Sequence, residues 1–104
     1  MNNVMQGVDD GLQWFKKHGL QDIVDSIDTD GPTFFLRDIH VDDPTSDYTL
    51  HSICESLKGA SAQKRTYSNR DERWRVQFST WVLVWNVIHP PASPKVVTEE
   101  TVQL

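Results

Sequence analysis

The sequence is poor in several features that would point directly to a class of protein. Of its 104 residues only one is a cysteine, Cys54, so no disulfide can form within the chain and we expect a reducing compartment. The longest apolar run, Trp81 to Trp85, is five residues, whereas a membrane-spanning helix needs roughly 18. The N-terminal residues show no basic stretch followed by an apolar one, and Asn2 excludes N-myristoylation. These absences predict an intracellular, cytoplasmic protein.

Patterns that would support catalysis or metal binding are also missing. The five glycines are scattered, which excludes a glycine-rich phosphate-binding loop. No nucleophile motif surrounds Cys54, and a zinc site shared by Cys54, His51 and His40 would lack the fourth ligand that structural zinc requires. Residues 28–31 are similar to part of a calcium loop, but Arg37 stands where a bidentate glutamate is needed. We therefore predict no catalytic residue, no metal ligand, no cofactor and no enzymatic activity; a small hydrolase or another enzyme is the alternative.

Charge is distributed unevenly along the chain, whose formal net charge is −5. Residues 1–60 hold eleven acidic and four basic side chains, whereas residues 61–104 hold four acidic and six basic ones. Five of these basic residues fall within twelve positions: Lys64, Arg65, Arg70, Arg73 and Arg75. Asp71 and Glu72 interrupt them and no nucleic-acid-binding signature accompanies them, so we expect no nucleic-acid partner. Such asymmetry is suited to steering a protein partner, while contact with a membrane surface is left open.

Apolar spacing predicts a helix near the N-terminus. Four apolar residues lie three and four positions apart, as they would on one face of a helix: Met5, Val8, Leu12 and Phe15. Lys16, Lys17 and His18 suit the last turn, and Gly19 can end the helix. Gly7 and Gly11 weaken the helix, because glycine has a low helix propensity.

Further short helices are predicted in the middle of the chain. Residues 20–27 read as a short amphipathic helix that the turn at residues 28–32 ends. Residues 33–41 fit strand alternation and helical spacing equally well, and we interpret them as a helix. The next predicted helix follows a turn at residues 42–46, is ended by Gly59 and has an apolar face made of Leu50, Ile53, Cys54 and Leu57.

The tryptophan-rich segment decides the predicted fold class. Aromatic and aliphatic residues repeat at intervals of four and three: Trp74, Phe78, Trp81, Trp85 and Ile88. Residues 69–89 contain no glycine or proline, so a helix capped at Ser68 and ended by Pro90 fits this length. The sequence thus predicts an all-α bundle of four to five helices at residues 1–89, with a flexible proline-containing tail at residues 90–104. Because Arg73 to Ser79 also alternates, the alternative is an α+β fold with residues 73–88 as a long strand.

The predicted long helix is apolar all round from Trp81 onward, so one side of it could support self-association. We expect a non-enzymatic protein-interaction or regulatory module, of the kind found among viral or phage accessory proteins. Its expected partner is a protein, either a different one or a second copy of this chain. The hypothesis places the interaction on the basic segment and two tryptophans: Lys64, Arg65, Arg70, Arg73, Arg75, Trp81 and Trp85.

One family resemblance covers about half of the chain. Residues 48–53 resemble the penultimate helix of retroviral matrix domains of the lentiviral type. Residues that resemble the last long helix of that family are Arg73, Phe78, Thr80, Trp85 and Val87. The resemblance implies a compact helical bundle that takes part in virion assembly at the membrane, often as a trimer. Asn2 stands where that family carries its acylated glycine, and the first half is acidic where the family presents a basic face.

Overall fold

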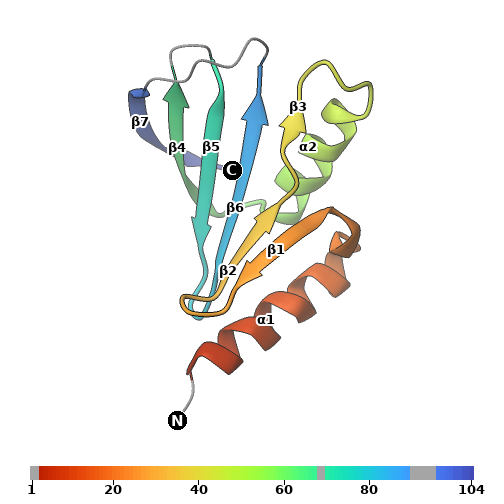
Figure 1. Cartoon of the computed structure of the whole chain (residues 1–104), viewed down its shortest axis with the longest axis vertical. Coiled ribbons are helices and arrows are strands. Elements are labelled where there is room, and N and C mark those ends of the chain that lie inside the picture. The colour runs from red at the N-terminus through yellow and green to blue at the C-terminus, as the bar shows by residue number, and fades with distance from the viewer. Residues whose placement is uncertain (1–2, 68–69, 90–95) are drawn as a thin grey trace.

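The computed structural model describes residues 3–67, 70–89 and 96–104, and the side chains of residues 3, 4, 96 and 97 are not described. Figure 1 shows two helices beside a large, strongly twisted sheet. The elements are α1 (Asn3–His18), the 3₁₀ turn η1 (Gln21–Ile23), β1 (Val24–Asp28), β2 (Thr33–Leu36), β3 (Ile39–His40), α2 (Ser46–Ser56), β4 (Ser61–Tyr67), β5 (Glu72–Gln77), β6 (Val82–Ile88) and β7 (Val96–Gln103). The fold is therefore α+β, and the predicted all-α bundle is wrong.

The sheet has seven strands in the order β1-β2-β6-β5-β4-β7, and β3 pairs with β6 beyond the end of β2. Strands β2 and β3 run parallel to β6, whereas every other pairing is antiparallel. Helix α2 therefore lies in the crossover between β3 and the antiparallel run β4-β5-β6. Parallel neighbours need such a long connection, because a short turn can join only antiparallel strands.

The tryptophan-rich segment is the main correction, because residues 70–89 do not form the predicted helix, whose expected cap at Ser68 lies outside the described residues. They contain β5 and β6, joined by a tight turn in which the amide of Phe78 donates to the carbonyl of Trp81 at 2.8 Å. Trp74 lies opposite Trp85 across this hairpin, and their rings stack with centroids 5.7 Å apart. The interval of eleven residues between these tryptophans also fits three turns of a helix. The spacing therefore predicted a helix where the chain forms a hairpin. The alternative α+β prediction is closer, although residues 73–88 form two strands instead of one.

Two other predicted helices are also strands. Residues 20–27 form η1 and β1, and residues 33–41 contain β2 and β3. The turn between β1 and β2 closes a hairpin instead of ending a helix: the Asp28 carboxylate accepts from the amide of Asp30 at 3.0 Å, an arrangement typical of aspartate in turns. The predicted N-terminal helix and the helix before Gly59 are confirmed as α1 and α2. Gly19, which ends α1, has the positive φ of +67° that favours glycine.

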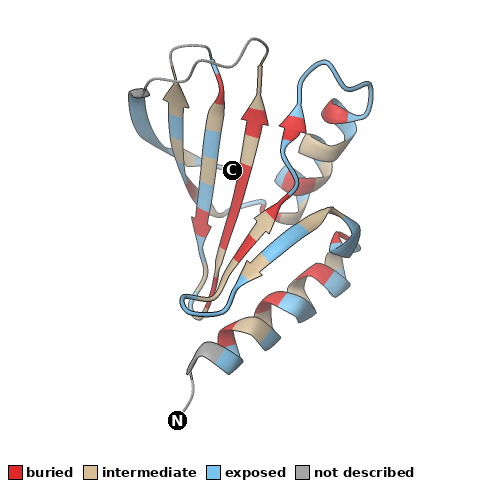
Figure 2. Ribbon diagram, in the orientation of Figure 1, coloured by how far each residue is buried: buried red, intermediate tan, exposed pale blue. Residues whose placement is uncertain are grey.

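The sheet has two unlike faces, named here the inner and the outer face. Side chains of the inner face join α1 and α2 in one hydrophobic core. Figure 2 marks buried positions on both helices and on the central strands. The inner-face members of this core are Phe34, Leu36, Ile39, Ala62, Val76, Leu83, Trp85 and Val87. Phe15 from α1, with Ile53 and Leu57 from α2, completes it, so both helices cover the same face. The outer face consists of the alternate residues of each strand.

Helix α1 packs through glycine instead of through its predicted apolar stripe. Gly7 and Gly11 are buried against the sheet, whereas Met5 is 57% and Leu12 48% exposed. A β-carbon at Gly7 would lie 2.1 Å from the carbonyl oxygen of Thr80. The glycines that appeared to weaken the helix therefore allow its close approach to the sheet, and only Phe15 of the predicted stripe is fully buried.

Strand β7 occupies one edge of the sheet, in a segment that the sequence placed in a flexible tail. It pairs with β4 along the whole length of that strand, from Ser61 to Tyr67. Two ion pairs join the strands, Lys64 with Glu100 at 3.7 Å and Arg65 with Glu99 at 2.7 Å. Residues 90–95, the first part of that predicted tail, lie outside the described residues.

Candidate functional site: the outer face of the sheet

Three of the chain's exposed arginines, Arg65, Arg73 and Arg75, lie on the outer face of β4 and β5. Strict alternation places Arg73, Arg75 and Gln77 outward on β5, while Trp74 and Val76 point to the core. On the neighbouring strands the outward residues are Gln63 and Arg65 on β4, and Val82, Val84 and Asn86 on β6. Both helices cover the inner face, so within the described ranges no helix covers these side chains.

Two adjoining depressions follow this face. The upper one, of about 290 Å³, is lined by Gln63, Lys64, Arg65, Arg73, Arg75 and Glu99. The lower one, of about 620 Å³, includes Arg75, Gln77, Thr80 and Thr33 and reaches the hairpin turns beside α1. Arg75 lines both, so the two depressions adjoin on the outer side of β5, and together they are called the groove here.

The arginines of the groove differ in what they already bind. Arg65 donates from Nε to Glu99 at 2.7 Å, and its pKa is raised by hydrogen bonding to Tyr67 and then to Glu99. Arg75 donates from Nη2 to the amide oxygen of Gln77 at 3.0 Å, a neutral partner. Among the residues that the structure describes, neither Arg73 nor Arg75 forms an ion pair with a carboxylate. The groove therefore holds two guanidinium groups whose charge is not balanced by a bound partner.

Lys64, which the sequence grouped with these arginines, lies on the opposite face. Its Nζ is 5.2 Å from the centre of the Trp74 ring and within 3.6 Å of Glu72 and 3.7 Å of Glu100. The Trp74 indole also donates to Glu72 at 2.9 Å. Two carboxylates and an aromatic ring thus satisfy the ammonium group, which stabilises the strands and leaves little charge for a partner.

The remaining predicted interaction residues are also dispersed. Arg70 sits in the turn between β4 and β5 with φ of 74°, and its amide donates to the carbonyl of Tyr67 at 2.8 Å. Trp81 and Trp85 are 4% and 1% exposed in the core, so they offer no surface to a partner. Of the seven predicted residues, the structure gathers Arg65, Arg73 and Arg75. The signal for Arg73 and Arg75 is the alternation from Arg73 to Ser79, on which the alternative α+β prediction rested.

Groups with catalytic or metal-binding chemistry do not converge. His51 and Cys54 are exposed on α2, and the Nε2 atom of His51 lies 3.9 Å from the carboxylate of Glu55. The pKa of the Cys54 thiol is raised by partial burial and then by Glu55, which disfavours the reactive thiolate. No group of three or more histidine, cysteine or acidic residues in the described ranges is placed to hold a metal ion. Cys54 was expected on the apolar face of its helix, and its exposure corrects that expectation.

Comparison with models of protein families, with curated proteins and with solved structures finds no match for this chain. Neither α1 nor α2, the helices of the described residues, is long and apolar enough to cross a membrane. The fold contradicts the resemblance to matrix domains. Residues 48–53 do lie on α2, but the residues expected to form the last long helix lie on the β5–β6 hairpin. A viral matrix-like bundle is therefore excluded as a description of this protein.

Proposed function

We propose that this protein is a non-enzymatic interaction module that binds an acidic surface of a partner protein through the outer face of its sheet. The observation that carries the proposal is the pair of exposed arginines, Arg73 and Arg75, which share one groove and have no carboxylate partner among the described residues. Arginine is enriched in protein interfaces because its planar group binds carboxylates with two parallel hydrogen bonds.

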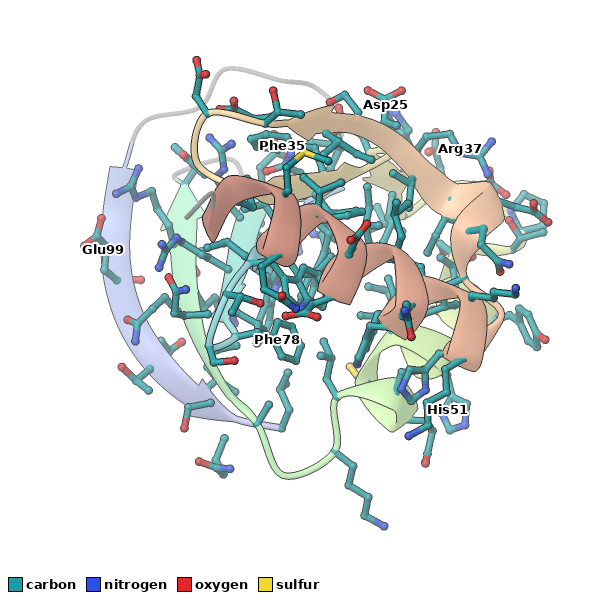
Figure 3. All side chains as sticks on the ribbon, turned by 90° about the horizontal axis from the view of Figure 1, so that it is seen from below. Asp25, Phe35, Arg37, His51, Phe78 and Glu99 are labelled. Atoms are coloured by element: carbon teal, nitrogen blue, oxygen red, sulfur yellow. The ribbon has the colours of Figure 1, made fainter. Side chains whose placement is uncertain are left out.

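Charge favours a protein over nucleic acid as the partner. The chain has a net charge of −5, and the basic groups of the groove are few. Acidic side chains also lie outside the groove: Asp25 of β1, for example, lies across the molecule from Glu99 of β7 (Figure 3). A polyanion running over the whole surface would meet these carboxylates, whereas a compact acidic patch would meet only the groove.

Self-association has lost its original support. The apolar side of the tryptophan-rich segment was expected to join two copies, but Leu83, Trp85 and Val87 are buried within one domain. A reducing, intracellular setting suits the module, because its single thiol, Cys54, is free and exposed.

Binding of a short acidic peptide, tetraglutamate with blocked termini, measured by calorimetry at several salt concentrations, tests the proposed function. We expect binding that weakens with salt and is lost in the double variant Arg73→Glu/Arg75→Glu. The control is Arg37→Glu/Lys58→Glu, which changes net charge equally at two exposed positions outside the groove. Equal binding by wild type and both variants would overturn the proposal.

A further inference from the structure

The two groove arginines that form no ion pair within the described residues are spaced like alternate residues of an extended chain. Arg73 and Arg75 are two positions apart on β5 and project from the same face. Alternate residues of a strand are roughly 6.6 Å apart along the chain. We propose that the groove binds an extended acidic segment of the partner whose carboxylates occur on alternate residues, one for each arginine. This inference rests on the proposed function and specifies the ligand of the same site.

The guanidinium groups are arranged for two anions instead of one. Arg75 donates to Gln77, which lies further along β5 on the side away from Arg73. That hydrogen bond draws the Arg75 head group away from Arg73, so the two charges are spread along the strand. A single phosphate would need the two groups to converge, whereas two carboxylates at strand spacing would not.

The chain itself contains an example of this recognition. Strand β7 is an extended acidic segment, and its Glu99 binds the outward Arg65 of the neighbouring strand at 2.7 Å. Arg65 lies directly opposite Arg73 in the β4–β5 register, so the same face already pairs one arginine with a carboxylate from a strand. The lining of the groove agrees with this ligand, since it continues past Arg75 to Gln77, two positions further along β5, and to Thr80.

Four eight-residue peptides with blocked termini test the inference by calorimetry at low salt. Three carry two glutamates that are adjacent, separated by one residue or separated by two residues, and the fourth has glutamine at both positions. We expect the peptide with one intervening residue to bind roughly tenfold more tightly than the other acidic peptides, as the gain of one charge-assisted pair implies. Either Arg73→Gln or Arg75→Gln should abolish this preference, while Arg37→Gln should leave it unchanged. Both groove arginines are exposed, and unchanged tryptophan fluorescence verifies that the variants fold.

Other outcomes overturn the inference in distinguishable ways. If all three acidic peptides bind equally and binding still needs Arg73 and Arg75, the spacing is wrong but the proposed function stands. If neither these peptides nor tetraglutamate binds, both the inference and the proposed function fail. If a phosphoserine peptide or a short single-stranded DNA binds more tightly than the glutamate peptides, the ligand is a phosphate and the proposed carboxylate ligand is wrong. Self-association in sedimentation velocity that disappears in Arg73→Gln/Arg75→Gln would show that the occupant is a second copy of this chain.

Discussion

Gly11 of helix α1 lies so close to the ring of Phe34 on β2 that a β-carbon on the glycine would be 2.2 Å from that ring. Phe34 is fully buried, and its ring also stacks on Phe15 at 5.2 Å between centroids. The aromatic ring therefore cannot move aside without disturbing the core. The absence of a side chain at position 11 sets the distance between the helix and the sheet.

The substitution Gly11→Ala is therefore expected to destabilise the protein, although alanine favours helix by about 1 kcal/mol. Overpacking of a filled core costs typically 1–3 kcal/mol, so we expect the net free energy of unfolding to fall by about 1 kcal/mol. Urea unfolding followed by tryptophan fluorescence measures this change. Gly31→Ala is the matched control, because a β-carbon there would meet no atom within 4 Å. A stabilised Gly11→Ala variant would contradict the packing argument.

A hydrogen bond between α1 and the β5–β6 turn makes a second prediction. The Thr80 hydroxyl donates to the carboxylate of Asp10, which also accepts from Gln6 at 2.8 Å. Because Asp10→Ala removes both bonds and leaves the half-buried hydroxyl without its partner, the free energy of unfolding should fall by about 1 kcal/mol or somewhat more. Asp9→Ala, at the neighbouring exposed position, should have a smaller effect. Equal effects in chemical denaturation would mean that only helix propensity had changed.

The sequence predicted helices α1 and α2 with their glycine ends, because these depend on local signals. It failed at the β5–β6 hairpin, where Trp74 and Trp85 satisfy helical spacing and strand pairing alike. The hairpin turn contains neither glycine nor proline, so no local signal marked it. What decides between the two structures is pairing with the flanking strands, of which β2 is distant in sequence from its partner β6. The candidate site was predicted incorrectly for the same reason. Only the strand assignment shows that Lys64 points to the opposite face from the outward arginines.

Attachment of β7 should depend on ionic strength. Its Glu99 and Glu100 pair with Arg65 and Lys64 of β4, and these ion pairs are at least partly exposed to solvent. The variant Glu99→Gln/Glu100→Gln should therefore accelerate hydrogen exchange of the β7 amides by a factor of about two to five, with β5 and β6 unchanged. High salt should produce a similar change in the wild type and little further change in the variant. The control Glu55→Gln removes a carboxylate from α2 and should leave β7 exchange as it was. Uniform acceleration in all strands would instead indicate global destabilisation.

The turn before α2 predicts a pH dependence. The pKa of Asp43 is lowered from its ordinary value of 3.8, first by the hydrogen bond from the Thr45 amide and then by that from the Thr45 hydroxyl. The carboxylate accepts these bonds at 2.9 and 2.8 Å, just before the helix begins at Ser46. A lowered folded-state pKa means that ionised Asp43 stabilises the fold above the unfolded pKa, and that this contribution is lost as pH falls through the folded pKa.

Asp43→Ala should therefore lower the thermal midpoint near neutral pH more than Asp42→Ala does. The deficit relative to wild type should remain constant down to about pH 5 and then shrink below about pH 4, as the wild-type carboxyl becomes protonated. Thermal unfolding followed by circular dichroism at a series of pH values measures both trends. A deficit that persists unchanged at the acid end would assign the loss to the alanine's effect on the turn backbone, because the charge of Asp43 would then contribute nothing to it.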